Sequence, residues 1–184
     1  MKNREEMPYR DCVGVALFNP EGLVFIGRRM ADPWIEDKTE ITAPWQMPQG
    51  GIDKDEDPLA AATRELFEET SIRSVRLIAE APGWILYDLP DEALGVALHG
   101  KYRGQRQRWF AFAFEGEEAE IDVLHPAAGA HNPEFDAWRW ERLELMPEII
   151  VPFKRDAYLQ VAAAFAGVPE MVRASEGRAL PQAG

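Results

Sequence analysis

The sequence contains one cysteine and only three histidines among its 184 residues. The single Cys12 excludes a disulfide within the chain, and one cysteine with three scattered histidines offers no spacing typical of a zinc site. A protein without an internal disulfide fits a reducing compartment. We therefore expect a cytoplasmic protein.

A long hydrophobic run is also missing. No apolar stretch approaches the roughly 18 residues that a membrane-spanning helix needs, and residues 1–11 are polar with charges of both signs, unlike a signal peptide. The sequence therefore indicates neither insertion into a membrane nor export.

Basic residues are outnumbered, with 20 Lys and Arg against 32 Asp and Glu and a net charge of -12. This balance argues against indiscriminate binding to DNA or to anionic membranes, because both carry the same sign of charge. We expect neither as a partner. A phosphate-rich substrate would need a local basic site or a metal ion.

The length of 184 residues is typical of a single domain, and 46% apolar with 28% charged residues is typical of a soluble globular protein. The chain becomes small and polar toward its end. We expect one domain over residues 1–168 and a mobile tail over 169–184.

The pattern of apolar residues predicts a mixture of strands and helices. Asp57 as N-cap and Pro58 at the first helical position predict a helix over 58–70, and helical spacing predicts another from Phe153 onward. Residues 31–46 have no period and are expected to form a loop. Strand patterns are found at 12–18, 23–26, 74–80, 83–88, 110–114 and 135–140, the first two as a hairpin.

The helix predicted over 58–70 carries an unfavourable group of charges. Glu65, Glu68 and Glu69 share one face, and the last two lie at the negative end of the helix dipole. A solvated acidic face is one explanation. The other is a Mg²⁺ or Mn²⁺ site, since these hard ions prefer carboxylate oxygens and share the phosphates of a substrate.

The segment from Gly50 to Ile72 resembles the Nudix box and meets eight of its nine fixed positions. Ser71 departs from it, because the box has glycine there; a serine in a left-handed conformation costs about 1 kcal/mol. The resemblance implies an α/β/α sandwich with a mixed sheet and metal-dependent hydrolysis of phosphoanhydrides. The matching residues are Gly50, Glu56, Arg64, Glu65, Leu66, Glu68, Glu69 and Ile72.

The same resemblance implies roles for individual residues. The box glutamates would bind the metal, Arg64 would position one of them by ion pairing, and Glu56 would support the loop and helix. Glu120, in an acidic stretch over 115–122, matches a further functional glutamate as metal ligand or base. The implied catalytic group is Glu65, Glu68, Glu69, Glu120 and Arg64.

Segments outside the box resemble a bacterial branch of the family that hydrolyses 5′-triphosphate ends of RNA or dinucleoside polyphosphates. They are residues 9–10, 45–51, 101–110, 133–140 and 151–155. Removal of pyrophosphate from RNA ends is the first expectation. Asymmetric hydrolysis of diadenosine tetra- and pentaphosphates is the alternative, and a catalytically silent nucleotide sensor is an alternative of another class.

Candidate substrate contacts follow from charge and aromatic character. Four bases without an intervening acid lie between Lys101 and Arg108, where phosphates could dock, although charged edge strands show the same pattern. Phe153 beside Lys154 offers a face for a base and a charge for a phosphate, and Tyr87 could also stack; both aromatic residues could equally be core. The expected substrate contacts are Arg10, Arg28, Gly50, Gly51, Tyr87, Lys101, Arg103, Arg106, Phe153 and Lys154.

Overall fold

The computed structural model describes residues 4–30, 45–95 and 97–176. Its strands are β1 (Tyr9–Phe18), β2 (Val24–Arg29), β3 (Trp45–Gln46), β4 (Gln49–Gly51), β5 (Val75–Glu80), β6 (Ile85–Asp88), β7 (Gly104–Phe114) and β8 (Phe135–Glu141). Its α-helices are α2 (Pro58–Thr70), α3 (Pro126–Gly129), α4 (Met146–Ile149), α5 (Arg155–Ala164) and α6 (Val168–Glu176). Short 3₁₀ turns cover Arg4–Glu6, Asp91–Ala93, Ala97–Gly100, Glu118–Glu120, Leu143–Leu145 and Pro152–Lys154.

The sheet is mixed and is built around one long parallel pair. β1 and β7 run parallel in unbroken register from the pair Tyr9 and Gly104 to the pair Phe18 and Ala113. On one side β1 pairs antiparallel with β2 and β4, and on the other side β7 pairs antiparallel with β5 and β6. β2 also carries β3 and β8. β1 from Cys12 onward and β7 from Trp109 onward are buried on both faces, which explains the nearly continuous apolar sequences of these segments.

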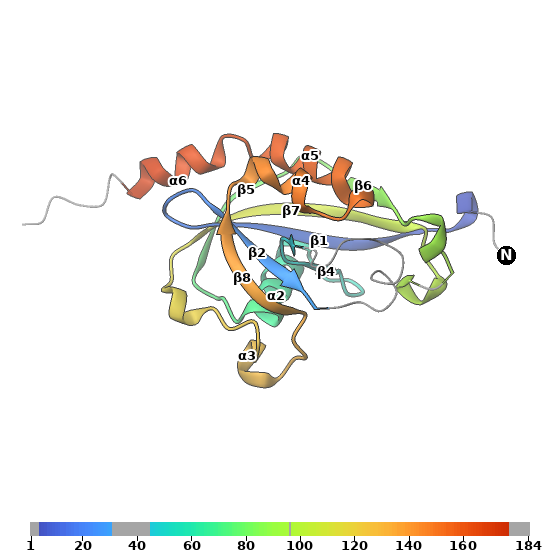
Figure 1. The fold of residues 1–184 in the computed structure, drawn as a ribbon, viewed down its shortest axis with the longest axis horizontal. Helices are drawn as coiled ribbons and strands as arrows, with labels where there is room; N and C mark the ends of the chain where they lie inside the picture. Colours follow the sequence, from blue (N-terminus) through green and yellow to red (C-terminus); the bar gives the residue numbers. More distant parts are fainter. Residues whose placement is uncertain (1–3, 31–44, 96, 177–184) are drawn as a thin grey trace, which may run out of the picture.

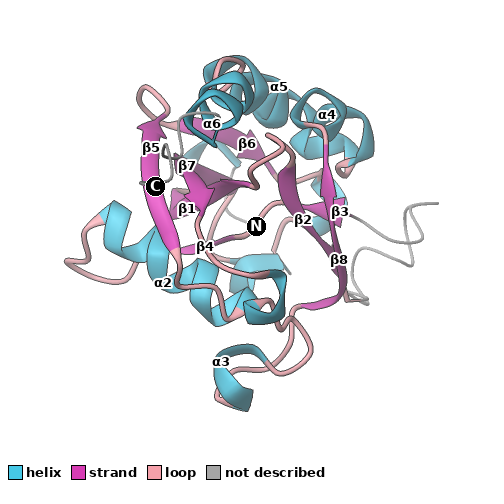
Figure 2. Cartoon of the chain, turned by 90° about the vertical axis from the view of Figure 1, so that its left-hand side faces the viewer, coloured by secondary structure: helices cyan, strands magenta, loops and turns pink. Residues whose placement is uncertain are grey.

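Helices cover both faces of this sheet, α2 on one side and α4, α5 and α6 on the other (Figures 1 and 2). Alternate residues of β1 face opposite ways: Val13 and Val15 belong to the core cluster that includes Leu66 of α2, whereas Phe18 belongs to the cluster that includes Tyr158 of α5. The expected α/β/α sandwich with a mixed sheet is confirmed. None of the helices in the described ranges is long and apolar enough to span a membrane.

The structure corrects the sequence analysis at several short strands. Residues 45–46, expected as the end of a loop, form β3, and residues 49–51 form β4; both are too short for a periodic pattern and are defined by pairing with β2 and β1. β7 begins at Gly104 rather than near 110; its first half escapes the apolar pattern because it is polar on both faces, with Gln105 and Gln107 buried and Arg106 exposed. The rest of the expected loop, residues 31–44, lies outside the described residues.

The expected tail begins as a helix. α6 covers Val168–Glu176, with Val168 and Val172 buried against the core and Arg173 donating to the backbone oxygen of Glu21 (3.2 Å). Residues 169–176, expected as part of a mobile tail, are thus placed in a nine-residue helix whose two valines pack on the core from one side. Residues 177–184 lie outside the described part of the chain.

Helix α2 begins and ends as its sequence predicts. Asp57 accepts a hydrogen bond from the Ala60 amide (3.1 Å), and Pro58 occupies the first turn. At the other end Ser71 is left-handed, with φ of 68°, and its amide donates to the oxygen of Phe67 (2.9 Å). A serine thus adopts the conformation for which the box normally uses glycine.

The close contact between β1 and the core can be tested at Gly14. A Cβ at this position would overlap the indole ring of Trp109, which is fully buried. We expect Gly14→Ala to lower the free energy of unfolding by about 1–3 kcal/mol through overpacking, as measured by urea denaturation. Gly167→Ala, which would add its Cβ in open space, is the control and should change stability by less than about 0.5 kcal/mol. Equal stability of both variants would contradict the packing.

Candidate active site

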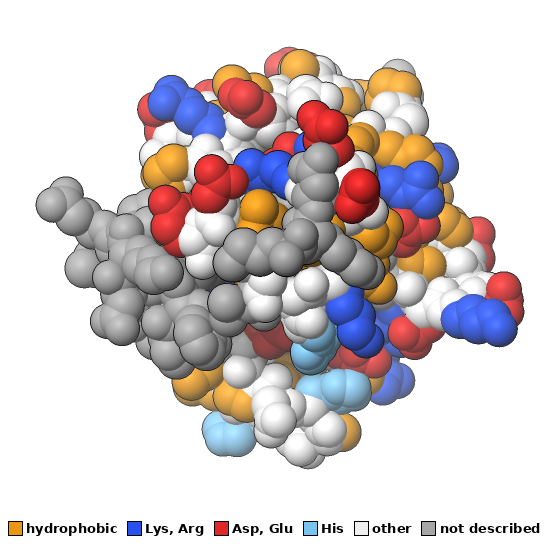
Figure 3. All heavy atoms as spheres, turned by 90° about the vertical axis from the view of Figure 1, so that its right-hand side faces the viewer, with side chains coloured by type: hydrophobic (Ala, Val, Ile, Leu, Met, Phe, Trp, Pro, Cys, Tyr) orange, Lys and Arg blue, Asp and Glu red, His pale blue; other side chains and the backbone are white. Residues whose placement is uncertain are grey.

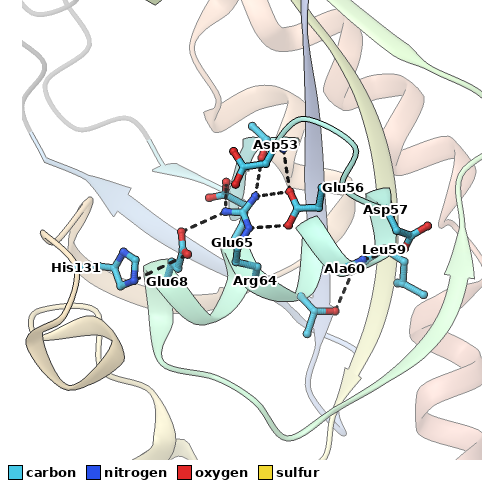
Figure 4. Close-up of polar contacts among 11 residues, drawn as sticks. Asp53, Glu56, Asp57, Leu59, Ala60, Arg64, Glu65, Glu68 and His131 are labelled. Atoms are coloured by element: carbon cyan, nitrogen blue, oxygen red, sulfur yellow. Dashed lines mark hydrogen bonds and ion pairs between the residues drawn. The ribbon is translucent and has the colours of Figure 1, made fainter.

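Arg64 is the centre of the hydrogen-bond network on α2 (Figure 4). Its guanidinium donates to both carboxylate oxygens of Glu56 (2.8 Å each) and to the backbone oxygen of Gly51 (2.8 Å). It also donates to Glu65 (2.8 Å) and Glu68 (3.2 Å). One side chain therefore fixes the loop before the helix, strand β4 and two of the glutamates relative to one another.

Glu56 completes the support of this loop. Its carboxylate accepts a further hydrogen bond from the Asp53 amide (2.8 Å). The hydrogen bonds from Arg64, and that from the Asp53 amide, lower the pKa of Glu56 to about 2. Glu56 therefore stays ionised at all physiological pH values and acts as a structural anion rather than a base.

The glycines of β4 bring the backbone close to the helix. A Cβ on Gly50 would overlap the carboxyl group of Glu65, so only glycine leaves room for that side chain. A Cβ on Gly51 would in turn overlap the guanidinium of Arg10, which places this predicted substrate contact beside β4. The structure thus brings Arg10 and both glycines together with the box glutamates.

Glu69 is the most buried of the three box glutamates, with 3% of its surface exposed. One carboxylate oxygen accepts a hydrogen bond from the Gln49 amide (3.2 Å), and the other is buried without a hydrogen-bond partner. Burial and the nearby carboxylates of Glu134 and Glu65 raise its pKa well above the usual range. An unpartnered carboxylate oxygen in such surroundings is costly unless a cation or proton occupies it.

Glu134 is a functional candidate that the sequence analysis missed. It lies just before β8, and its carboxylate is close enough to raise the pKa values of both Glu65 and Glu69. Its backbone oxygen accepts a hydrogen bond from the Met30 amide (2.8 Å), which fixes it beside the end of β2. No local signal marks it, because its position beside α2 depends on the pairing of β2 with β8.

The donor set fits a hard divalent cation. Burial and the neighbouring Glu68 and Glu134 carboxylates raise the pKa of Glu65, against the opposing effect of Arg64, so a bound cation would relieve the repulsion in this group. Within the described ranges, no three His, Cys, Asp or Glu side chains are arranged so that they could hold a metal ion by themselves. Mg²⁺ commonly keeps waters and takes phosphate oxygens as further ligands, so an incomplete protein cage suits it.

Glu120 does not lie in this group. Its carboxylate accepts hydrogen bonds from the backbone amides of Arg73 (2.5 Å) and Ser74 (2.9 Å), just after α2. Partial burial raises the pKa of Glu120, but the hydrogen bonds from these two amides outweigh it and lower the pKa below its usual value. Glu134, rather than Glu120, is the fourth carboxylate that the structure brings to the box.

The expected basic island is largely neutralised by ion pairs. Arg103 pairs with Asp88 (3.0 Å), and Arg106 pairs with Asp11 (2.6 Å). Arg108 pairs with Glu80, and Lys101 is exposed. The partner acids come from other strands, so the sequence around residues 101–108 does not reveal them. Basic and acidic side chains are likewise interspersed on the face shown in Figure 3.

Arg28 is also paired, with its Nε 2.6 Å from Asp136 across the β2–β8 pair. The side chain is 40% exposed, so this is a surface pair of small energetic value. The structure therefore places Arg28 on the sheet surface and gives no contact between it and the box glutamates.

The other predicted contacts form a second, largely buried group, close enough to the site for the charges of Glu69 and Glu134 to act on the pKa of Lys154. Lys154 is buried, its Nζ lies 3.4 Å from Oε1 of Gln46 and 5.3 Å from the ring of Tyr87. Phe153, half-buried, packs on Tyr87 with ring centres 5.7 Å apart. Burial, with repulsion from Arg29, lowers the pKa of Lys154 to about 7. Tyr87 and Phe153 are thus partly core, the alternative that the sequence left open.

Comparison with known proteins gives a consistent result. A model of the NUDIX domain matches residues 8–161. A protein of Rhizobium meliloti that carries the name RNA pyrophosphohydrolase is 58% identical over 163 residues, covering 88% of this chain and 95% of that protein. A protein of the same name from Mesorhizobium japonicum is 56% identical, covering 89% of this chain and 93% of that protein.

Solved structures are similar at much lower identity. The Ap4A hydrolase of C. elegans in a binary complex matches with a TM-score of 0.57 at 16% identity, over 86% of this chain and 98% of that one. The dihydroneopterin triphosphate pyrophosphohydrolase of E. coli matches with a TM-score of 0.56 at 19% identity, over 83% and 96%. At these identities the likeness establishes the shared fold alone.

The buried charge of Glu69 predicts that Glu69→Gln raises the melting temperature without metal and weakens the stabilisation that metal gives. In metal-free buffer at pH 8, Glu69→Gln should melt at a higher temperature than the wild type, because a carboxyl whose pKa is raised destabilises the fold once ionised. The difference should close as the pH falls below 4.5, where Glu69 is protonated in both the folded and the unfolded state. Added Mg²⁺ should stabilise the wild type more than the variant, since binding to the native state contributes RT ln(1 + [L]/Kd).

Calorimetry at several pH values, with and without Mg²⁺, measures both effects. Glu92→Gln removes an exposed carboxylate and is the control that should shift neither. A variant that gains as much from Mg²⁺ as the wild type does would place the ion elsewhere.

Burial of Lys154 predicts a second pH-dependent effect. Its folded pKa of about 7 lies below the ordinary lysine value of 10.5, so the unfolded chain binds more protons between these values and stability rises with pH. We expect Lys154→Met to raise the melting temperature at pH 7 and this advantage to shrink by pH 9.5. Lys101→Met, at an exposed position, is the matched control. A constant advantage across this range would show that Lys154 does not titrate there.

Proposed function

The chain belongs to the NUDIX family, and on that premise we propose that it removes pyrophosphate from the 5′-triphosphate end of RNA. The observation that carries this assignment is the 58% identity, across nearly the full length of both chains, to a protein named RNA pyrophosphohydrolase. The site supports it, because the glutamates and the Arg64 network that a hydrolase of phosphoanhydrides needs are intact.

We propose that Glu65, Glu68 and Glu69 hold Mg²⁺, or Mn²⁺ in its place, together with Glu134 in the role that the sequence analysis assigned to Glu120. The buried unpartnered oxygen of Glu69 supports this choice, as does the repulsion among these carboxylates. When bound, the ion would supply charge neutralisation for the polyphosphate and would lower the pKa of a water molecule.

The residues of the chain then carry the proton and position the substrate. A water oxygen attacks phosphorus, the phosphoanhydride P–O bond breaks, and pyrophosphate leaves the 5′-monophosphate of the RNA. One of the box glutamates accepts the proton of the water; Glu69 is suited to this because burial raises its pKa well above the usual range. The guanidinium of Arg10, held against Gly51, would share charge on the phosphate oxygens.

Arg64 and Glu56 act through these groups rather than on the substrate. Arg64 has its donors engaged by Glu56, Glu65, Glu68 and the oxygen of Gly51, which leaves it as a positioning residue. Tyr87 and Phe153 present an aromatic pair beside Lys154, and we propose that a base of the RNA binds at this pair.

A direct comparison of substrates tests the function. We expect the wild type with Mg²⁺ to release pyrophosphate from a short 5′-triphosphorylated RNA, to leave the 5′-monophosphate, and to do so with a higher kcat/KM than for diadenosine tetraphosphate. Products are identified by mass spectrometry, and Glu69→Gln, purified in the same way, measures contaminating activity.

The other outcomes separate the alternatives. A higher kcat/KM for diadenosine tetraphosphate would identify a hydrolase of dinucleoside polyphosphates. Binding of both compounds without turnover, at any concentration of Mg²⁺ or Mn²⁺, would identify a nucleotide sensor and overturn the proposed enzyme.

A further inference from the structure

Ser71 makes contacts that the glycine of the box cannot make. Its Oγ accepts a hydrogen bond from the Ala127 amide (2.9 Å) and donates one to the backbone oxygen of Asp122 (3.3 Å). Both partners lie more than 50 residues away in the chain. The hydroxyl therefore joins the C-terminal end of α2 to the segment 122–134, which is defined here as the arm.

The arm is held at its start and at its end. Its first residue, Asp122, donates its amide to the oxygen of Thr70 (3.0 Å). Its last residue, Glu134, accepts a hydrogen bond from the Met30 amide (2.8 Å). Between these points the Ser71 hydroxyl accepts a hydrogen bond from α3, which lies beyond the sheet on the α2 side (Figures 1 and 2). Val123 and Pro126 of the arm are also buried, Val123 in the core cluster that includes Leu66 of α2.

The conformation of the arm near Ser71 needs support. Ala127 and Ala128 are left-handed, with φ of 52° and 58°, although neither is glycine. Such conformations cost free energy and persist where surrounding contacts hold them. The bond from the Ala127 amide to Ser71 Oγ is a contact at the first of these residues.

The arm carries two side chains to the box glutamates. Nε2 of His131 lies 3.9 Å from Oε1 of Glu68, on the side opposite Arg64 (Figure 4). Glu134 faces Glu65 and Glu69, and like charges there repel the arm from the helix. A tether between arm and helix opposes this repulsion.

We propose that Ser71 is a positioning residue of this site, whose hydroxyl fastens the arm to the end of α2 so that His131 and Glu134 face the glutamates. The role rests on the proposed function for its effect on turnover, but the tether itself does not. It explains why a serine is compatible with a position that favours glycine: the hydroxyl compensates for the left-handed backbone.

Two substitutions at Ser71 separate the hydroxyl from the backbone. Ser71→Gly removes the hydroxyl and relieves the left-handed strain, whereas Ser71→Ala removes the hydroxyl and keeps the strain. We expect Ser71→Gly to be the more stable of the two by melting temperature. Both should show the same fall in kcat on triphosphorylated RNA, by about 3- to 10-fold, with KM changed less. Both should also need more Mg²⁺ for half-maximal rate.

Amide hydrogen exchange tests the hydrogen bond between Ser71 and Ala127 without any substrate. The Ala127 amide should exchange faster in both variants than in the wild type, while the amides of β1 keep their protection. His99→Gly, which relieves a left-handed residue (φ 58°) outside the arm, is the control for strain alone and should leave kcat unchanged.

Each outcome decides the proposal. Activity that follows melting temperature, with Ser71→Gly as active as the wild type, would show that Ser71 serves only the backbone and would overturn it. Unchanged exchange at Ala127 would overturn the tether. A wild type without hydrolase activity would contradict the proposed function, and faster exchange at Ala127 in both variants would still support the tether.

Discussion

The Arg64 guanidinium is the interaction on which the site depends. It holds Glu56 in the loop, the oxygen of Gly51 in β4, and the carboxylates of Glu65 and Glu68 on α2. A planar group with five donors can satisfy all of these acceptors at once, which a lysine cannot. Because β4 pairs with β1, this one side chain sets the helix against the central strands of the sheet.

The same network leaves charge uncompensated where chemistry is expected. Arg64 has a single positive charge and pairs with Glu56, Glu65 and Glu68, so these three carboxylates together keep a net negative charge. Glu69 accepts one backbone hydrogen bond and lies near the Glu134 carboxylate, so it is buried beside a group of the same charge. Arg64 therefore fixes the geometry of the site and leaves the buried acids to a cation from solution. On the proposed function, this is why Glu69 lowers the stability of the metal-free fold and yet is needed for turnover.

Local sequence order predicted what α2 contributes and little of what surrounds it. The spacing of Glu65, Glu68 and Glu69, the Asp57 cap and the left-handed Ser71 follow from one helix and were confirmed as geometry. The short strand β4 and the approach of Glu134 depend on pairing between distant segments, which no local period encodes. The basic residues from 103 to 108 lost their apparent free charge for the same reason, since their acidic partners stand on neighbouring strands.

Ser71 shows how a local rule and a tertiary contact combine. Judged within α2 alone, a serine at a left-handed position is an unfavourable substitution for glycine. Judged with the arm in place, the same hydroxyl supplies two hydrogen bonds to a segment that like charge pushes away from the helix. The backbone strain is confined to Ser71, whereas the hydrogen bonds stabilise the arm on the other side of the site. A departure from a motif is therefore better evaluated by the contacts of the substituted side chain than by the motif alone.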